Sequence, residues 1–145
     1  SVELAPAGDL ASTLAQRGVS LRVEGKDGLT LLGSKGMLDE MVYNLADNAV
    51  KYNREGGSVT LSFMREGDDC LIRVRDTGIG IAPMHLGHIF ERFYRADKSR
   101  SKKTGGTGLG LSIVKHVAEY HGGRVEVEST EGEGSLFTCR LPIKS

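Results

Sequence analysis

The sequence has no net charge, no long apolar run and few cysteines, and each lack narrows the possible functions. Its 145 residues carry 19 lysines and arginines against 19 aspartates and glutamates, so overall charge favours neither nucleic acid nor an anionic membrane as a partner. No apolar segment approaches the ~18 residues of a membrane-spanning helix. The first residues also lack an initiator methionine and the basic and apolar regions of a signal peptide. We therefore expect a cytoplasmic domain excised from a longer protein.

The two cysteines, Cys70 and Cys139, do not have the spacing of a metal site or a disulfide framework. We expect two reduced thiols that pack as small hydrophobes. A chain of this length buries roughly 68–70% of its unfolded surface, which is enough for a core without metal or disulfide. Residues 1–145 are therefore predicted to form a single domain, and no internal repeat or low-complexity segment divides them.

Hydrophobic periodicity predicts a mixture of helices and strands. Ser34 is a plausible N-cap for a long helix to about Asn53, since apolar residues recur there at i, i+3 and i+4. Further helices are predicted at 9–17 and at about 109–121, and strands at the start of the chain, over 19–24 and 29–32, around 59–63 and 72–76, and over 124–130 and 135–141. Hairpins at both ends of this order, the first across the turn "GKDG", favour one sheet covered on one face by helices.

Residues 84–108 break the regular pattern and carry six basic residues before ending in glycines. A loop of more than ~15 residues in a compact domain is usually a functional lid or disordered. We expect this segment to be a long, partly mobile loop.

Asp76 ends a strand and is predicted to point inward. It shares one side of the strand with Ile72 and Val74, so its carboxylate should face the side covered by helices. An ionised carboxylate in such a place needs hydrogen-bond donors. Alone, this pattern fits a helix cap or a salt bridge as well as a ligand with an exocyclic amine, such as adenine.

Two glycine clusters accompany this acid. Gly78 and Gly80 allow backbone to pass close to a flat ligand. The second cluster, "GGTGLG" at 105–110, precedes a helix start, where free amides favour phosphate. It has neither a Walker nor a Rossmann pattern, and in isolation a flexible hinge explains it equally well.

The long helix adds a polar stripe, because Asn44, Asn48 and Lys51 fall at i, i+4 and i+7. A side-chain carbonyl such as that of Asn48 suits Mg²⁺, which takes few protein ligands when it also binds nucleotide phosphates. Lys51 could then meet a phosphate and Tyr52 could line a base, although each residue alone is also compatible with an ordinary surface or core-edge position.

Four segments together resemble the N, G1, F and G2 boxes of the catalytic and ATP-binding domain of sensor histidine kinases. They are "NLADNAVKY" (44–52), "DTGIG" (76–80), "IFERFYR" (89–95) and "GGTGLGLSIV" (105–114). They occur in the family order, and the resemblance extends over nearly the whole chain. The wider group is the Bergerat-fold ATPases, which include gyrase, Hsp90 and MutL.

The resemblance implies an α+β two-layer sandwich: a mixed five-stranded sheet covered by three helices, with a mobile ATP lid. It implies ATP and Mg²⁺ as cofactors. Asp76 would bind the adenine amino group, Tyr52 the base edge, and Gly78, Gly80 and Ile81 would form the adenine pocket. Asn48 would bind Mg²⁺, Lys51 a phosphate and Arg95 the terminal phosphate, and the lid would contact the phosphates through Gly106, Gly108, Leu109 and Gly110. Phe90 and Phe93 are expected to anchor the lid to the core.

Asn44 separates kinases from hydrolases in this resemblance, because the hydrolases have a glutamate there that activates water. An amide is no general base, so we expect transfer of the γ-phosphate to an incoming histidine, with Asn44, Asn48 and Arg95 as the catalytic residues. Glu40 is a weaker candidate base.

No "H-E" acceptor box occurs, and the four histidines (His85, His88, His116 and His121) fall in the lid or on the second helix. The acceptor histidine is therefore expected in a dimerisation domain N-terminal to this chain. The implied partners are that domain and a response regulator, in a homodimeric, membrane-anchored bacterial sensor whose isolated fragment is monomeric and turns over little ATP. An anti-sigma-type serine kinase of the same fold and a nucleotide-gated interaction module are the alternatives.

Overall fold

The structure is a computed structural model that describes residues 2–3, 19–25, 30–31, 33–91 and 110–143. Its elements are β1 (Val2–Glu3), β2 (Ser20–Gly25), β3 (Thr30–Leu31), α2 (Lys35–Lys51), β4 (Ser58–Glu66), β5 (Asp69–Asp76), α3 (Pro83–Leu86), α5 (Gly110–Tyr120), β6 (Arg124–Thr130) and β7 (Gly134–Pro142). The helix expected at 9–17 lies outside the described residues.

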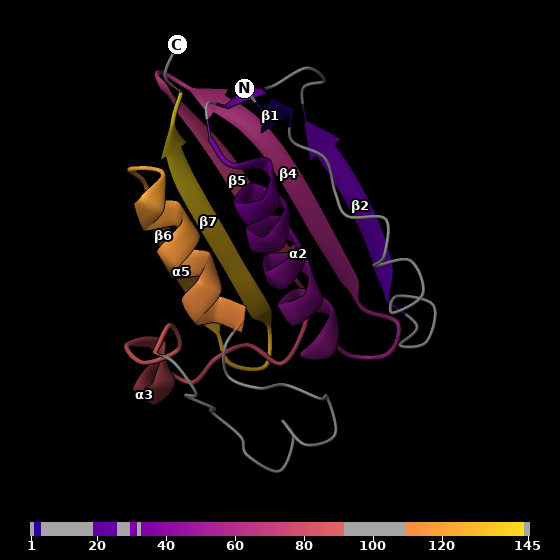
Figure 1. Cartoon of the computed structure of the whole chain (residues 1–145). Coiled ribbons are helices and arrows are strands. Elements are labelled where there is room, and N and C mark those ends of the chain that lie inside the picture. The colour runs from indigo at the N-terminus through magenta and orange to yellow at the C-terminus, as the bar shows by residue number, and fades with distance from the viewer. Residues whose placement is uncertain (1, 4–18, 26–29, 32, 92–109, 144–145) are drawn as a thin grey trace.

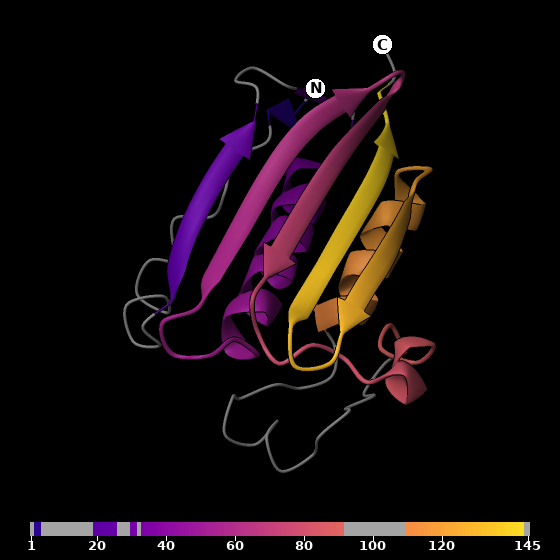
Figure 2. The same cartoon turned by 180° about the vertical axis from the view of Figure 1, so that it is seen from behind.

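Five strands form one mixed sheet in the order β2-β4-β5-β7-β6. Strand β2 runs parallel to β4, and the other neighbours are antiparallel. Figure 1 shows α2 and α5 side by side over one face of the sheet, and Figure 2 shows the other face. The expected two-layer α+β sandwich with a mixed five-stranded sheet is confirmed.

The hairpin expected across "GKDG" is wrong. Strand β3 pairs with β1 in a separate two-stranded sheet, whereas β2 pairs with β4. Parallel neighbours need a long crossover, which is usually a helix, and α2 supplies it between β2 and β4. Alternating apolar residues predict a strand but do not specify which strand it pairs with.

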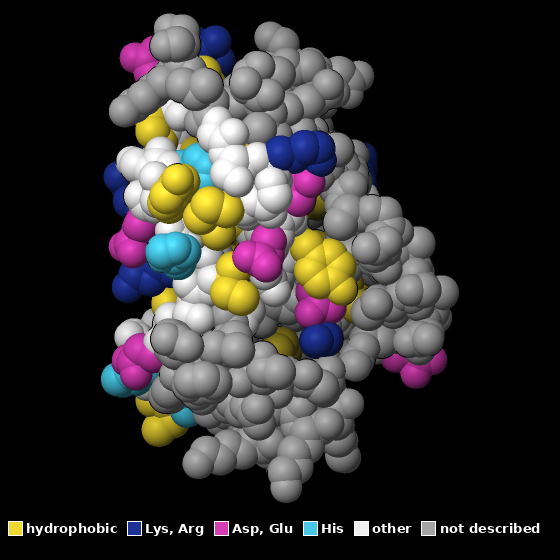
Figure 3. Space-filling view, viewed as in Figure 1, with side chains coloured by type: hydrophobic (Ala, Val, Ile, Leu, Met, Phe, Trp, Pro, Cys, Tyr) yellow, Lys and Arg dark blue, Asp and Glu magenta, His cyan; other side chains and the backbone are white. Residues whose placement is uncertain are grey.

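Helix α2 forms where its periodicity predicts. The Ser34 Oγ accepts a hydrogen bond from the Met37 N–H at 3.4 Å, which caps the first turn. Its apolar stripe is buried against the sheet: Leu38, Met41, Val42, Leu45, Ala46, Ala49 and Val50. The core between α2, α5 and the sheet therefore fixes which face of the helix carries the polar stripe. Figure 3 shows hydrophobic, acidic and histidine side chains interspersed over this helical side.

The two cysteines lie in this core, as expected. Both are free and fully buried. Burial raises the pKa of Cys70 to about 11, and burial together with the neighbouring Cys70 raises the pKa of Cys139 to about 12. Both thiols therefore stay protonated at neutral pH.

The segment predicted as a loop from residue 84 begins with the single helical turn α3, and residues 92–109 lie outside the described ranges. Phe90 packs edge-on against the buried Phe137, with ring centroids 6.1 Å apart. This contact matches the anchoring expected of Phe90. Among the described helices, none is both long and apolar enough for a membrane crossing.

Candidate functional site

The candidate site lies at one end of the molecule, the lower end in Figures 1 and 2. There the C-terminal turn of α2, the C-terminal end of β5, the N-terminus of α5 and the turn between β6 and β7 come together. Segments that are far apart in the sequence thus bring together three of the four predicted motifs.

Asp76 is buried at the end of β5, with only 8% of its surface exposed. Its Oδ1 accepts a hydrogen bond from the Gly78 N–H at 2.9 Å. Burial raises the pKa of the Asp76 carboxyl, and backbone hydrogen bonds from Gly78 and Ser135 partly offset this by lowering it. The predicted inward orientation is confirmed, and among the described residues the carboxylate is held by backbone donors and not by a cation.

Gly78 is required by the packing of the motif on the end of α2. A Cβ at this position would lie 2.4 Å from the Tyr52 carbonyl oxygen and 3.0 Å from the Asp76 Oδ1. The next N–H, that of Ile79, donates to the same Tyr52 oxygen at 3.1 Å. The loop after β5 is therefore fixed to the helix that carries the polar stripe.

Gly80 fixes the other side of this loop to the β6–β7 turn. It adopts a φ of 71°, and a Cβ there would lie 2.2 Å from the Thr130 carbonyl oxygen. The Ile81 N–H donates to the Ser129 Oγ at 2.8 Å. Contacts within the protein are therefore enough to explain why residue 80 is a glycine. The predicted contact of Gly80 and Ile81 with a base stays a prediction.

The polar stripe of α2 reaches the start of α5. The Asn44 Nδ2 donates to the Glu40 carbonyl at 2.8 Å, and its Oδ1 faces Gly110, where a Cβ would lie 3.3 Å away. The Lys51 Nζ lies 3.0 Å from the Asp47 carboxylate. The structure thus brings the predicted Asn44 beside the predicted Gly110.

Asn48 is the predicted metal ligand on this stripe. It is partly buried, and within the described ranges its side-chain amide makes no hydrogen bond. An amide oxygen is a donor type that Mg²⁺ accepts, so the residue present fits a metal held by one side chain and by nucleotide phosphates.

Sequence reasoning missed two residues that hold the site together. The Asn53 side chain, 8% exposed, donates to the Ser58 carbonyl at 2.9 Å and accepts from the Arg54 N–H at 2.8 Å. The Arg54 Nη2 donates to the carbonyls of Gly78, at 3.3 Å, and of Gly132. The sequence signal was an asparagine at the end of the predicted helix, where a residue type typical of turns marks a change of direction.

The remaining predicted site residues fall on the lid. Arg95, Gly106, Gly108 and Leu109 lie outside the described residues, as does Phe93. Their predicted contacts with phosphate or with the core therefore stay predictions.

Comparison with known proteins identifies the fold and the family. Residues 33–145 match the model of the "histidine kinase-, DNA gyrase B-, and HSP90-like ATPase" family. The sensor-like histidine kinase SenX3 of Mycobacterium tuberculosis is 46% identical over 124 residues, which are 86% of this chain and 30% of that protein. The chain thus spans about a third of the length of such curated relatives.

Solved structures agree. The mycobacterial sensor histidine kinase MprB matches with a TM-score of 0.79 and 28% identity, over 93% of this chain and 89% of that one. Full-length ShkA, solved in complex with AMPPNP, matches with a TM-score of 0.79 and 29% identity, over 100% of this chain and 32% of its own. The resemblance inferred from the four motifs is confirmed.

Proposed function

The chain belongs to the histidine kinase-, DNA gyrase B- and HSP90-like ATPase family, as an ATP-binding catalytic domain of the histidine kinase type, and we propose that it transfers the γ-phosphate of Mg-ATP to a histidine on a separate dimerisation domain. The supporting observation is the convergence at one end of the fold. The buried Asp76, the polar stripe of α2 and the N-terminus of α5 lie together there.

The adenine end of the site rests on Asp76. Its carboxylate is buried, carries no cationic partner among the described residues and is oriented by the Gly78 and Ser135 backbone. A buried acceptor of this kind is suited to an exocyclic amine, and a hydrogen bond to a charged group contributes about 1.5–3 kcal/mol. Gly78, Gly80 and Ile81 would surround the ring, and Tyr52 would lie at its edge.

The phosphate end rests on α2 and the lid. Asn44 carries an amide where a hydrolase needs a proton acceptor, and its Nδ2 already donates to the Glu40 carbonyl. Water is therefore not activated by this residue, and an imidazole from another domain supplies its own nucleophilic nitrogen. Lys51, Arg95 and the glycines and leucine of the lid (Gly106, Gly108, Leu109 and Gly110) would hold the phosphates.

Asn48 would provide the oxygen ligand for Mg²⁺. When bound, the metal would neutralise charge on the phosphate oxygens. The Asn48→Asp substitution tests this role, because a carboxylate changes the charge next to the metal and the phosphates. We expect it to alter ATP affinity more in Mg²⁺ than in EDTA, measured by titration calorimetry. Equal losses with and without the metal would contradict the assignment.

The proposal also covers the partner domains and the location of the parent protein. The acceptor histidine would lie in a dimerisation domain of the same polypeptide, a response regulator would receive the phosphoryl group, and the parent would be a homodimeric, membrane-anchored sensor with this domain in the cytoplasm. Alone, the domain would bind ATP but turn over little of it.

The test supplies the acceptor-histidine segment of the parent polypeptide as a separate fragment, with γ-labelled ATP and Mg²⁺. We expect label on the fragment that is lost in acid and kept in base, as a phosphohistidine requires. A fragment with the acceptor histidine replaced by glutamine is the control. Tight ATP binding without label would support a nucleotide-gated interaction module instead, and acid-stable label on serine would support a serine kinase.

A further inference from the structure

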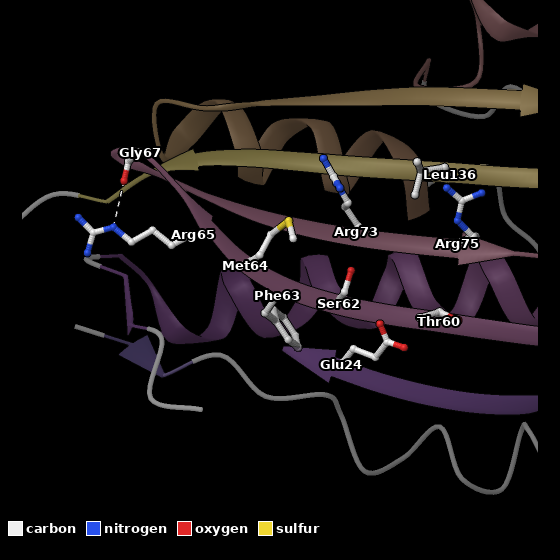
Figure 4. Close-up of a pocket in the computed structure, with 10 residues that line it drawn as sticks. All are labelled: Glu24, Thr60, Ser62, Phe63, Met64, Arg65, Gly67, Arg73, Arg75 and Leu136. Carbon is white, nitrogen blue, oxygen red and sulfur yellow. Dashed lines mark hydrogen bonds between the residues drawn. The ribbon is translucent and has the colours of Figure 1, made fainter. Parts of the chain in front are cut away.

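The sheet face opposite α2 and α5 carries a hollow with a distinctive charge pattern. No helix among the described residues covers this face (Figure 2). The hollow has a volume of about 860 Å³. Its walls include Glu24 of β2, Thr60 and Ser62 of β4, Arg73 and Arg75 of β5 and Leu136 of β7 (Figure 4).

Arg73 and Arg75 differ from the other arginines on this face. The others on this face are in ion pairs: Arg22 with Glu24, Arg124 with Glu126, and Arg140 with Glu66 and Asp69. Arg65 also lines the hollow, but it pairs in the sheet with the core residue Cys70, and its Nε donates to the Gly67 carbonyl. Within the described ranges, Arg73 and Arg75 have neither an ion pair nor a hydrogen bond. The Nε of Arg73 is buried without an acceptor, as is that of Arg140, but the Arg140 guanidinium is paired through its Nη1. The Arg73 guanidinium therefore lacks the acceptors that the paired arginines of this face have, and an incoming carboxylate could supply them through its terminal nitrogens.

The surroundings favour carboxylates carried by a protein. In the sheet register Arg73 lies between Ser62 and Thr138, and the next residues outward along this row are Glu24 and Glu126. Each acid is already paired with an arginine on its own strand, Glu24 with Arg22 and Glu126 with Arg124, so the positive charge left without a partner is on Arg73 and Arg75 of the central strand. Two separate carboxylates on an extended protein segment match two such isolated charges more closely than the continuous phosphates of a membrane surface or nucleic acid do.

Apolar side chains add to the surface. Met64 is 40% exposed, and Leu136 lines the same hollow. Because Arg73 and Arg75 are two residues apart on one strand, their Cα atoms are about 6.6 Å apart. We propose that this face is a docking surface for an acidic segment of a protein partner, which places carboxylates on Arg73 and Arg75. The surface lies on the other side of the sheet from the helices and is independent of the proposed phosphotransfer.

The test uses the whole chain with ¹⁵N-labelled arginine and follows the Nε–Hε resonances at about 0.1 M salt, where the screening length is about 10 Å. The probe is a capped peptide of alternating aspartate and threonine, and the control peptide has asparagine for aspartate. We expect saturable shifts at Arg73 and Arg75 with the aspartate peptide and none with the control. Absence of shifts with the aspartate peptide would overturn the proposal.

Matched substitutions separate a specific contact from general attraction. Arg73→Gln and Arg75→Gln should each weaken binding of the aspartate peptide about tenfold, as expected for a lost charge-assisted hydrogen bond. Arg65→Gln removes the same charge from the same hollow and should change binding less than twofold. Equal losses in all three would overturn the proposal. So would a duplex oligonucleotide or phosphatidylserine vesicles that shift the same resonances at lower concentration, or self-association of the chain through this face.

Discussion

Strand β5 carries charged residues on both faces of the sheet, and the burial and hydrogen bonding of these residues differ between the two faces. On the helix-covered face, Asp76 is buried and its carboxylate accepts backbone hydrogen bonds. On the opposite face, Arg73 and Arg75 have no ion-pair partner within the described ranges. A charge removed from water needs partners from the fold, as Asp76 has, whereas the exposed Arg75 can remain without them. Arg73 lies between these cases, because it is half-buried and its Nε has no acceptor. The inward charge is therefore tied to many neighbours, and the outward charges can be replaced with little consequence for the fold.

Gly78→Ala should have the largest effect on stability, because Gly78 lies next to Asp76 where the backbone is closely packed against the end of α2. The added Cβ would meet the Tyr52 carbonyl at 2.4 Å, and backbone cannot easily move away. We expect a loss of about 3 kcal/mol in the free energy of unfolding, at the upper end of overpacking costs. Urea denaturation measures this change.

The control for this substitution is Gly36→Ala, at the start of α2, where a Cβ would meet nothing within 4 Å. It should leave stability unchanged or raise it by up to about 1 kcal/mol through helix propensity. Equal effects of the two substitutions would show that the contact with Tyr52 does not matter.

Asp76→Asn should weaken ATP binding about 10- to 100-fold and leave the fold intact. The amide keeps one acceptor oxygen but has an NH₂ group in place of the other. If the oxygen keeps the bond from the Gly78 N–H, the NH₂ group faces the adenine amino group, and two donors then meet. Titration calorimetry measures the affinity, and Asp39→Asn, which removes a carboxylate paired with Lys35, is the control. An unchanged affinity in Asp76→Asn would contradict the adenine role.

The pH dependence of ATP binding should reveal the same carboxyl. Burial raises the pKa of Asp76, so the folded protein holds this proton more tightly than the unfolded chain does. The contribution of Asp76 to the stability of the nucleotide-free fold is therefore present below the unfolded pKa and is lost as pH rises through the folded one. Binding of the amino group has the opposite sign, since it needs the ionised acceptor.

We therefore expect ATP affinity to fall as the pH is lowered from neutrality toward the raised pKa of Asp76, more steeply in the native chain than in Asp76→Asn. The substituted chain corrects for protonation of the nucleotide itself. Calorimetric titrations at matched pH values compare the two, and parallel profiles would exclude Asp76 as the titrating group.

Arg75→Gln should have the smallest effect and completes the comparison between the faces. The residue is exposed and has no hydrogen-bond or ion-pair partner among the described residues. Stability should change by no more than about 0.5 kcal/mol, as for most surface substitutions, and ATP affinity by less than twofold. A loss of ATP affinity comparable with that of Asp76→Asn would show that the two faces are coupled.

Local sequence patterns predicted much of the fold and one key feature of the site. The spacing of apolar residues placed α2, and the alternation Ile72, Val74, Asp76 placed the carboxylate on the buried side. Such periodicities depend only on the geometry of one helix or one strand. The partner of β2 was not predictable in this way, because pairing depends on how α2 returns the chain to the sheet.

The sequence by itself determined which residues are inward and which motif family they form. The tertiary structure decided which contacts hold these residues in place. Only the folded chain brings the Tyr52 carbonyl against Gly78, the Thr130 carbonyl against Gly80 and the Arg54 side chain onto the Gly78 and Gly132 carbonyls. These are contacts between segments that are distant in the sequence, so their geometry follows from the packing of α2 and the β6–β7 turn around the end of β5.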